Sequence, residues 1–310
     1  MPYEEEEGKD MNDIMMEIND LTKYYGDVKG VEDLSLKLRK GEIFGFIGPN
    51  GAGKSTTIRS VMNLINKTKG QVLINGKPFE KNDVETKRII GYLPSEVHLY
   101  DDMTVKKIFD YHESFYSKTN SSTKKSVHDR REELAELLWI DESKRIEDLS
   151  LGNLKKVGII LALMHQPALL ILDEPTSGLD PIMQNVFYDL LLEEKNKGTT
   201  IFYSTHILSE VAKICDRVGI IRKGKLIKVE NVDSLSDKSL TFVTIRSAQV
   251  TDIVNELGVR IISEEKNYVR FANSIPDNEL IKILSHYTID KLLIEEATLE
   301  DIFFHYYTED

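Results

Sequence analysis

Residues 48–55 constrain the fold of this chain more than any other stretch. They read Gly48-Pro49-Asn50-Gly51-Ala52-Gly53-Lys54-Ser55, which fits the GxxxxGK[ST] pattern of phosphate-binding loops. Residues 43–47 before them form a short apolar run, and residues 56–65 after them carry apolar side chains at helical spacing. A strand, a glycine-rich turn and a helix in this order let backbone N–H groups converge on phosphates at the positive end of the helix. We therefore predict an α/β nucleotide-binding core.

Within this loop the residue types assign roles. Lys54 is expected to reach the β and γ phosphates of a nucleotide, and the Ser55 hydroxyl is expected to ligate Mg²⁺. The residues predicted to bind the nucleotide here are Gly48, Pro49, Asn50, Gly51, Ala52, Gly53, Lys54, Ser55 and Thr56.

A second motif supplies paired carboxylates. Residues 168–172 are apolar enough for a buried parallel strand, and Asp173 and Glu174 follow directly. Neighbouring strand residues point to opposite faces, so the two acids can differ in role. Asp173 is predicted to hold Mg²⁺ through water, and Glu174 to orient or deprotonate the attacking water. The alternative is a pair of solvated loop acids, which the preceding buried strand disfavours.

Further motifs follow in a fixed order over about residues 14–230 and together resemble those of ABC transporter ATPases. Residues 149–153 resemble the signature sequence LSGGQ, residues 177–180 the D-loop, and His206 the switch histidine of that family. Tyr25 resembles the aromatic residue that stacks on adenine, with Tyr24 as its competitor. A phosphate loop alone is also found in GTPases and small-molecule kinases, but those proteins lack the signature.

The resemblance implies a Mg²⁺-dependent ATPase that works as a head-to-tail dimer with a second ATPase subunit, either an identical or a related chain. Each phosphate loop then faces the partner's signature, so Ser150 and Gly152 are expected to contact the γ-phosphate across the interface, and Asp180 is expected to take part in nucleotide binding. Lys54, Glu174 and His206 are the implied catalytic residues. Ser150 suits a helix N-cap, whose helix dipole would favour a phosphate.

Two departures from the family pattern stand out. The family has Gln after Tyr92-Leu93-Pro94, where it touches Mg²⁺, but Ser95 and Glu96 follow here. Either residue, or a bridging water, is a candidate for the missing metal contact. In the signature, Leu151 and Asn153 replace Gly and Gln, while Ser150 and Gly152 remain.

The chain divides into three parts. We expect residues 1–12 to be an acidic disordered tail, residues 13–232 to be the ATPase domain with antiparallel β and helical subdomains, and residues 233–310 to be a small α+β domain of ferredoxin-like type. The helical subdomain should span about residues 96–166. Its first helix is predicted to bury one face that includes Phe109 and Phe115, and residues 118–126 are predicted to form a loop.

Charge and hydropathy limit the partners. The net charge of −12 argues against nucleic acid as a partner, because such binders rely on basic surfaces. No apolar run approaches the roughly 18 residues that span a bilayer, and the acidic N-terminus does not fit a signal peptide. We expect a cytoplasmic protein, peripheral at the inner face of the membrane, with a multispan transmembrane permease subunit as its partner.

The direction of transport is predicted from the last residues. Residues 296–303 resemble the C-terminal end of ATPases that serve bacterial exporters of drugs, antibiotics and lipids, so export is the preferred function. The main alternative is a soluble ABC ATPase that drives a non-transport conformational change. A P-loop kinase with a phosphate acceptor is a more distant rival.

Overall fold

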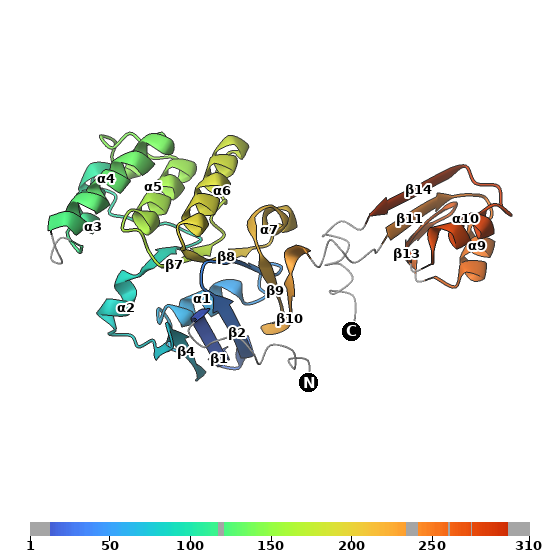
Figure 1. Ribbon diagram of the computed structural model, residues 1–310, viewed down its shortest axis with the longest axis horizontal. Coiled ribbons are helices and arrows are strands. Elements are labelled where there is room, and N and C mark those ends of the chain that lie inside the picture. The colour runs from blue at the N-terminus through green and yellow to red at the C-terminus, as the bar shows by residue number, and fades with distance from the viewer. Residues whose placement is uncertain (1–12, 117–120, 234–240, 260, 274, 297–310) are drawn as a thin grey trace. The chain divides into compact units, whose positions relative to one another are not determined.

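The computed structural model describes residues 13–116, 121–233, 241–259, 261–273 and 275–296 (Figure 1). The chain forms two compact units that meet in sequence between Asn231 and Val232. The expected acidic tail and residues 297–303 of the exporter-like end lie outside the described residues.

The first unit is built on a six-stranded sheet in the order β10-β9-β3-β8-β7-β6. Strands β9, β3, β8, β7 and β6 run parallel, and β10 pairs antiparallel with β9. The bounds are Ile43–Ile47 for β3, Ile90–Leu93 for β6, Leu169–Asp173 for β7, Thr200–Thr205 for β8, Arg217–Arg222 for β9 and Lys225–Asn231 for β10. Strands β3, β7 and β8 are buried along their whole length, and the apolar runs at residues 43–47 and 168–172 indicated this for β3 and β7.

A second sheet of the first unit is antiparallel, in the order β2-β1-β4-β5. Its strands are Ile14–Tyr25 (β1), Val28–Arg39 (β2), Lys69–Ile74 (β4) and Lys77–Pro78 (β5). One apolar core joins the two sheets, because Ile18 of β1 and Leu36 of β2 belong to the same buried cluster as Phe44 of β3 and Phe202 of β8. Burial of these side chains fixes the phosphate loop between the sheets.

Helices connect the strands. Their bounds are Lys54–Val61 (α1), Val84–Arg88 (α2), Val105–Glu113 (α3), Ser121–Leu137 (α4), Leu151–Leu163 (α5), Pro181–Asn196 (α6) and Leu208–Ile214 (α7), with a 3₁₀ turn at Ile146–Asp148. The helix after the phosphate loop is shorter than its apolar spacing predicted, since it ends at Val61. None of the helices in the described ranges combines the length and apolarity needed to cross a membrane.

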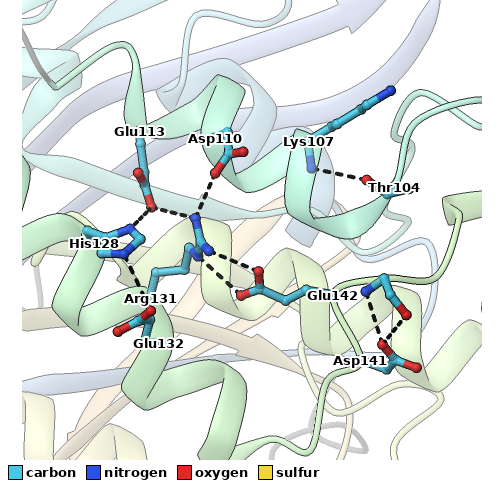
Figure 2. A network of polar contacts seen from close by, with 10 residues as sticks. Thr104, Lys107, Asp110, Glu113, His128, Arg131, Glu132, Asp141 and Glu142 are labelled. Carbon is cyan, nitrogen blue, oxygen red and sulfur yellow. Dashed lines mark hydrogen bonds and ion pairs between the residues drawn. The ribbon is translucent and has the colours of Figure 1, made fainter.

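The helical segment between β6 and β7 is held by a buried arginine (Figure 2). Arg131 of α4 donates to Asp110 and Glu113 of α3 at 2.9 Å each, and pairs with both carboxylate oxygens of Glu142 at 2.9 and 3.1 Å. A buried guanidinium needs such partners, because the charge would otherwise be costly to desolvate. The network therefore fixes α3, α4 and the turn at Glu142 as one body.

Two predictions for this segment are wrong. The polar residues 121–126 begin α4 and do not form a loop, because Ser, Thr and Lys disfavour a helix only weakly. The remainder of the predicted loop, residues 118–120, lies outside the described residues. Phe115 is not on the buried face of α3, which ends at Glu113, and half of its surface is exposed. Its ring instead meets Tyr111 edge to face at 5.0 Å.

A partly buried histidine is expected to make the helical segment sensitive to acid. The Nε2 atom of His165 donates to the Ile90 carbonyl at 3.1 Å, and burial lowers the pKa of His165 to about 4 from an ordinary 6.5. The unfolded chain therefore binds a proton that the folded chain excludes, so stability falls as the pH drops from about 6.5 to about 4. We expect a loss of up to about 3 kcal/mol from this group, since one pKa unit is worth ~1.4 kcal/mol.

Urea unfolding of wild type and His165→Gln at pH 7.5 and pH 4.5 measures this effect. The variant should lose less stability on acidification than wild type. The exposed residue His98 provides the control, since His98→Gln should leave the wild-type pH dependence unchanged. Equal acid sensitivity of wild type and His165→Gln would contradict the assignment.

The second unit has the strand and helix order β-α-β-β-α-β. Its elements are Thr241–Arg246 (β11), Val250–Leu257 (α9), Ile261–Glu265 (β12), Tyr268–Asn273 (β13), Asp277–Leu284 (α10) and Lys291–Glu296 (β14). The sheet is antiparallel throughout, in the order β12-β13-β11-β14, and α9 and α10 contribute to its apolar core. This is the ferredoxin-like α+β arrangement predicted from the sequence.

Candidate functional site

The parallel strands bring the predicted site residues to one edge of the sheet. Ile47 pairs with Thr205, Asp173 with Ser204, and Leu93 with Leu172. The phosphate loop after β3, the acids at the end of β7, His206 after β8 and the Ser95 loop after β6 therefore all begin at the carboxyl ends of neighbouring strands. This edge is where open α/β sheets bind ligands.

The phosphate loop has a backbone that only glycine allows at two points. Gly53 has φ +111°, and a Cβ there would lie 2.8 Å from the Gly30 carbonyl oxygen. At Gly48 a Cβ would lie 2.4 Å from the Ile221 carbonyl oxygen. Helix α1 begins at Lys54 with no acidic residue in its first turn and no side-chain cap. The first turn of α1 therefore supplies no carboxylate to its own positive end, which favours a bound anion.

Three predicted catalytic side chains meet at this edge. The Lys54 ammonium lies 3.2 Å from Glu174 Oε1, and His206 Nδ1 lies 3.4 Å from the same oxygen. Lys54 also donates to the carbonyls of Gly48 at 2.8 Å and Pro49 at 3.3 Å. These contacts place the cation at the mouth of the phosphate loop and beside the acid of β7.

The two neighbouring acids have different surroundings. Asp173 is fully buried, and its Oδ1 accepts a bond from the Ser204 hydroxyl at 2.7 Å, while Oδ2 has no hydrogen-bond partner. Glu174 is partly exposed, and its backbone has φ +47°, an uncommon conformation for a residue other than glycine. Its N–H donates to the Ser204 carbonyl at 3.1 Å, which holds the strained turn in place. Strain at a residue aimed into a site is a frequent mark of function.

Tyr24 and Tyr25, the two candidates for stacking on adenine, have different surroundings. The Tyr24 hydroxyl donates to Glu32, and this bond is the main reason why the pKa of Glu32 is lowered to about 2. Tyr25 is 46% exposed, and its ring has the Lys23 ammonium 4.9 Å from its centroid. A Cβ at Gly30 would lie 3.0 Å from both Tyr25 and Thr56, so the Tyr25 ring lies near the start of α1.

The signature residues lie at the start of α5. Ser150 is its N-cap and accepts from the Asn153 N–H at 3.3 Å. A Cβ at Gly152 would lie 2.7 Å from the Gly178 carbonyl, so the signature packs closely against the D-loop of the same chain. Asp180 caps α6, because its side chain accepts bonds from the N–H groups of Ile182 and Met183, both at 3.0 Å.

The loop that follows β6, with Ser95 and Glu96, makes contacts that the sequence did not indicate. The Glu96 side chain is exposed and lies 3.4 Å from His98 Nε2. The Ser95 carbonyl accepts a bond from Lys155 of α5 at 2.7 Å. Neither Lys155 nor this contact was expected from the sequence.

Sequence reasoning also missed Glu210 of α7. This buried carboxylate accepts hydrogen bonds from the hydroxyls of Thr176, Tyr188, Tyr203 and Thr205, at 2.6, 3.1, 3.0 and 2.5 Å. The Thr205 hydroxyl in turn accepts from the Ile207 N–H at 3.0 Å, so both neighbours of His206 are fixed. The sequence feature that could have indicated Glu210 is its position on the same face of α7 as the buried residues Val211 and Ile214.

The parallel sheet, the glycine-rich loop ending in Lys54, and the acids of β7 define a P-loop nucleoside triphosphatase. A family model described as ABC transporter matches residues 31–177. The chain belongs to the ABC transporter family of ATP-binding proteins, which confirms the resemblance and the fold class predicted from the sequence.

Two relatives span almost the whole chain. Bacitracin transport ATP-binding protein BcrA of Bacillus licheniformis is 33% identical over 93% of this chain and 96% of its own length. Linearmycin resistance ATP-binding protein LnrL of Bacillus subtilis is 32% identical over 93% of this chain and 97% of its own. A solved ATP-binding subunit of an ABC transporter superposes with a TM-score of 0.65 at 26% identity, covering 87% of this chain and 99% of that chain.

Proposed function

We propose that this chain hydrolyses Mg²⁺-ATP in a dimer and thereby drives export through a separate membrane-spanning partner. The observation that carries the proposal is the meeting of Lys54, Glu174 and His206 at the carboxyl edge of the parallel sheet, beside the start of α1. Two of the relatives that match nearly the full chain are named for bacitracin transport and linearmycin resistance, and both names fit an export function.

In the proposed reaction the phosphates lie along residues 48–56, with their charge neutralised by the N–H groups of the loop and by Lys54. Lys54 exchanges its bonds to Gly48 and Pro49 for oxygens of the β and γ phosphates. Glu174 then orients the attacking water and accepts its proton. His206, next to Glu174, donates to the γ-phosphate as negative charge shifts during bond cleavage.

Magnesium fits this site. Asp173 Oδ2 is a buried oxygen with no hydrogen-bond partner, which leaves it free to bind a cation or a metal-bound water. In the described part of the chain no cluster of three or more His, Cys, Asp or Glu residues could hold a metal. Such a cluster is not required, because magnesium is typically held by one or two protein oxygens together with substrate phosphates and waters. Ser55 and Asp173 would hold the ion, which would withdraw charge from the transferred phosphate.

A dimer would complete the site. The chain carries one phosphate loop and one signature segment. Leu151 at the start of α5 is 67% exposed, although it is apolar and next to the capping residue Ser150. A second ATPase subunit placed head to tail would cover Leu151 and bring its own ATP to Ser150, to Gly152 and to the positive end of α5.

Tyr25 is proposed to stack on adenine. Tyr25→Ala should lower the affinity for ATP by about 1 to 3 kcal/mol, the usual value of a base–aromatic stack, while Tyr25→Trp should keep most of it. Titration calorimetry with a non-hydrolysable ATP analogue measures both. The matched change Tyr24→Ala should leave affinity unchanged, because its hydroxyl is bonded to Glu32. Loss of affinity in the Tyr24 variant alone would move the stacking role by one residue.

An aromatic row supports docking to a membrane partner. Tyr100, Tyr111 and Phe115 are each at least half exposed, and their rings follow one another edge to face at 6.4 and 5.0 Å. Exposed aromatic side chains in one row are characteristic anchors of protein interfaces. The row begins five residues after Ser95, so a docked partner would contact the segment next to the nucleotide site. This would place the chain on the cytoplasmic face of the membrane.

Purification from the native host in detergent, followed by identification of the retained proteins, tests this function. A polytopic membrane protein should be retained by wild type and lost with Tyr100→Ala/Tyr111→Ala. Retention should persist with Trp139→Ala, another exposed aromatic residue, whose ring faces Lys156. Retention of ribosomes would instead support an ABC ATPase that drives a non-transport change.

A further inference from the structure

Lys155 is an almost fully buried cation at the edge of the nucleotide site. It lies on α5, five residues after the capping Ser150, and only 3% of its surface is exposed. Its ammonium donates to the carbonyl oxygens of Pro94 at 3.2 Å and Ser95 at 2.7 Å. Burying a lysine is costly unless its donors are used, so these bonds mark a fixed contact between α5 and the loop after β6.

The contact belongs to a continuous helix face. Lys155, Gly158 and Ala162 are spaced at i, i+3 and i+7, on one side of α5. A Cβ at Gly158 would lie 2.8 Å from both Leu93 and Val97, and a Cβ at Gly91 would lie 2.1 Å from the Ala162 carbonyl. Helix α5 therefore lies tightly along β6 and the loop that follows it.

The loop is held by its backbone at the position where the family pattern has a glutamine. Both bonds from Lys155 end on carbonyl oxygens, so they do not depend on the side chain at position 95. Leu93 pairs with Leu172 of β7, so the next residues of the two strands, Pro94 and Asp173, lie at the same edge. Burial lowers the pKa of Lys155. The negative charges of Asp173, Glu174 and Glu96 act in the opposite direction and favour the charged ammonium.

We propose that Lys155, and not a side chain at position 95, fastens the Ser95 loop to the helix that carries the signature segment. Lys155 is a positioning residue: ATP bound at the start of α5 moves the loop through this amine. The loop leads directly to the aromatic row at Tyr100, so the same contact passes the nucleotide state toward the membrane partner. This consequence rests on the proposed function, whereas the fastening itself rests on the geometry.

Hydrogen exchange of backbone amides tests the proposal without the membrane partner. The background is Glu174→Gln, chosen to hold ATP, and each variant is compared with and without Mg²⁺-ATP. In this background ATP should protect residues 48–57 and also residues 95–99. With Lys155→Met added, which keeps the stem but removes every donor, protection of residues 48–57 should remain while that of residues 95–99 should fall at least tenfold.

Two control variants bracket this result. Lys156→Met removes the neighbouring ammonium, which faces the Trp139 ring at 5.8 Å, and should leave both protections within twofold of the background. Ser95→Ala removes the side chain at position 95 and should also change neither. The proposal is overturned if Lys155→Met keeps the protection of residues 95–99 within twofold, or if Ser95→Ala loses it as Lys155→Met does.

The same measurement separates this inference from the proposed function. If ATP protects neither region in the background variant, the proposed nucleotide site is wrong. If both regions are protected there and Lys155→Met leaves both protected, only the role of Lys155 is wrong. Should Lys155→Met fail to fold in a thermal melt, Lys155→Gln replaces it with the same expectation, because its polar group is one atom too short to reach both carbonyls.

Discussion

Glu174→Gln is expected to slow ATP hydrolysis by roughly 10²- to 10⁴-fold, the range lost with a positioned base, while ATP binding persists. The amide keeps the size of the side chain but cannot accept the proton of the attacking water. It also removes the negative charge that faces Lys54 at 3.2 Å, so Lys54 is left free for the phosphates. ATP that binds but is not cleaved should hold two chains together.

Steady-state ATPase rates and size-exclusion mass with Mg²⁺-ATP check both parts of this prediction. The variant should elute as a dimer with ATP and as a smaller species with ADP. Asp180→Asn is a useful comparison, because Asp180 caps α6 with a side-chain oxygen that asparagine also provides, and a large rate loss there would point to a separate role. Near-normal turnover of Glu174→Gln would remove Glu174 from catalysis.

Lys54→Ala is expected to weaken binding of ATP by roughly 10- to 100-fold, since a charge-assisted hydrogen bond contributes about 1.5 to 3 kcal/mol. Binding of adenosine should change much less, because the ammonium lies at the mouth of the phosphate loop and adenosine has no phosphate for it to bind. Unlike Glu174→Gln, this variant should not accumulate as a dimer with ATP. Calorimetry with ATP and with adenosine separates the two contributions.

The control for this prediction is Lys107→Ala, a change of an exposed lysine on α3 that contacts the solvent. It should leave the affinity for ATP unchanged. Equal affinity of Lys54→Ala and wild type for ATP would show that the phosphates lie elsewhere.

The residues of the candidate site could be predicted because their sequence signals are local. Glycines at 48 and 53, a lysine and a serine at fixed offsets, and an apolar strand ending in two acids all lie within short segments. Strands that run parallel in one sheet have their carboxyl ends at the same edge, however long the connections between them.

Predictions from the local sequence pattern were wrong at the ends of two helices. Phe115 fits the apolar period of α3, but the helix ends two residues earlier, so its ring joins Tyr111 on the surface. Residues 121–126 are polar, yet they begin α4. In both cases the error lies in where the helix begins or ends. That position depends on packing and capping, and the spacing of apolar residues does not determine it.

The sequence determined the class of this protein, since strand periodicity, glycine positions and paired acids are set by residues near one another in the chain. Only the tertiary structure decided what Lys155 and Glu210 do. Lys155 meets a loop 60 residues away, and Glu210 gathers hydroxyls from three other elements. A buried charge is stabilised by partners that folding brings together, and no spacing along the chain records which partners those are.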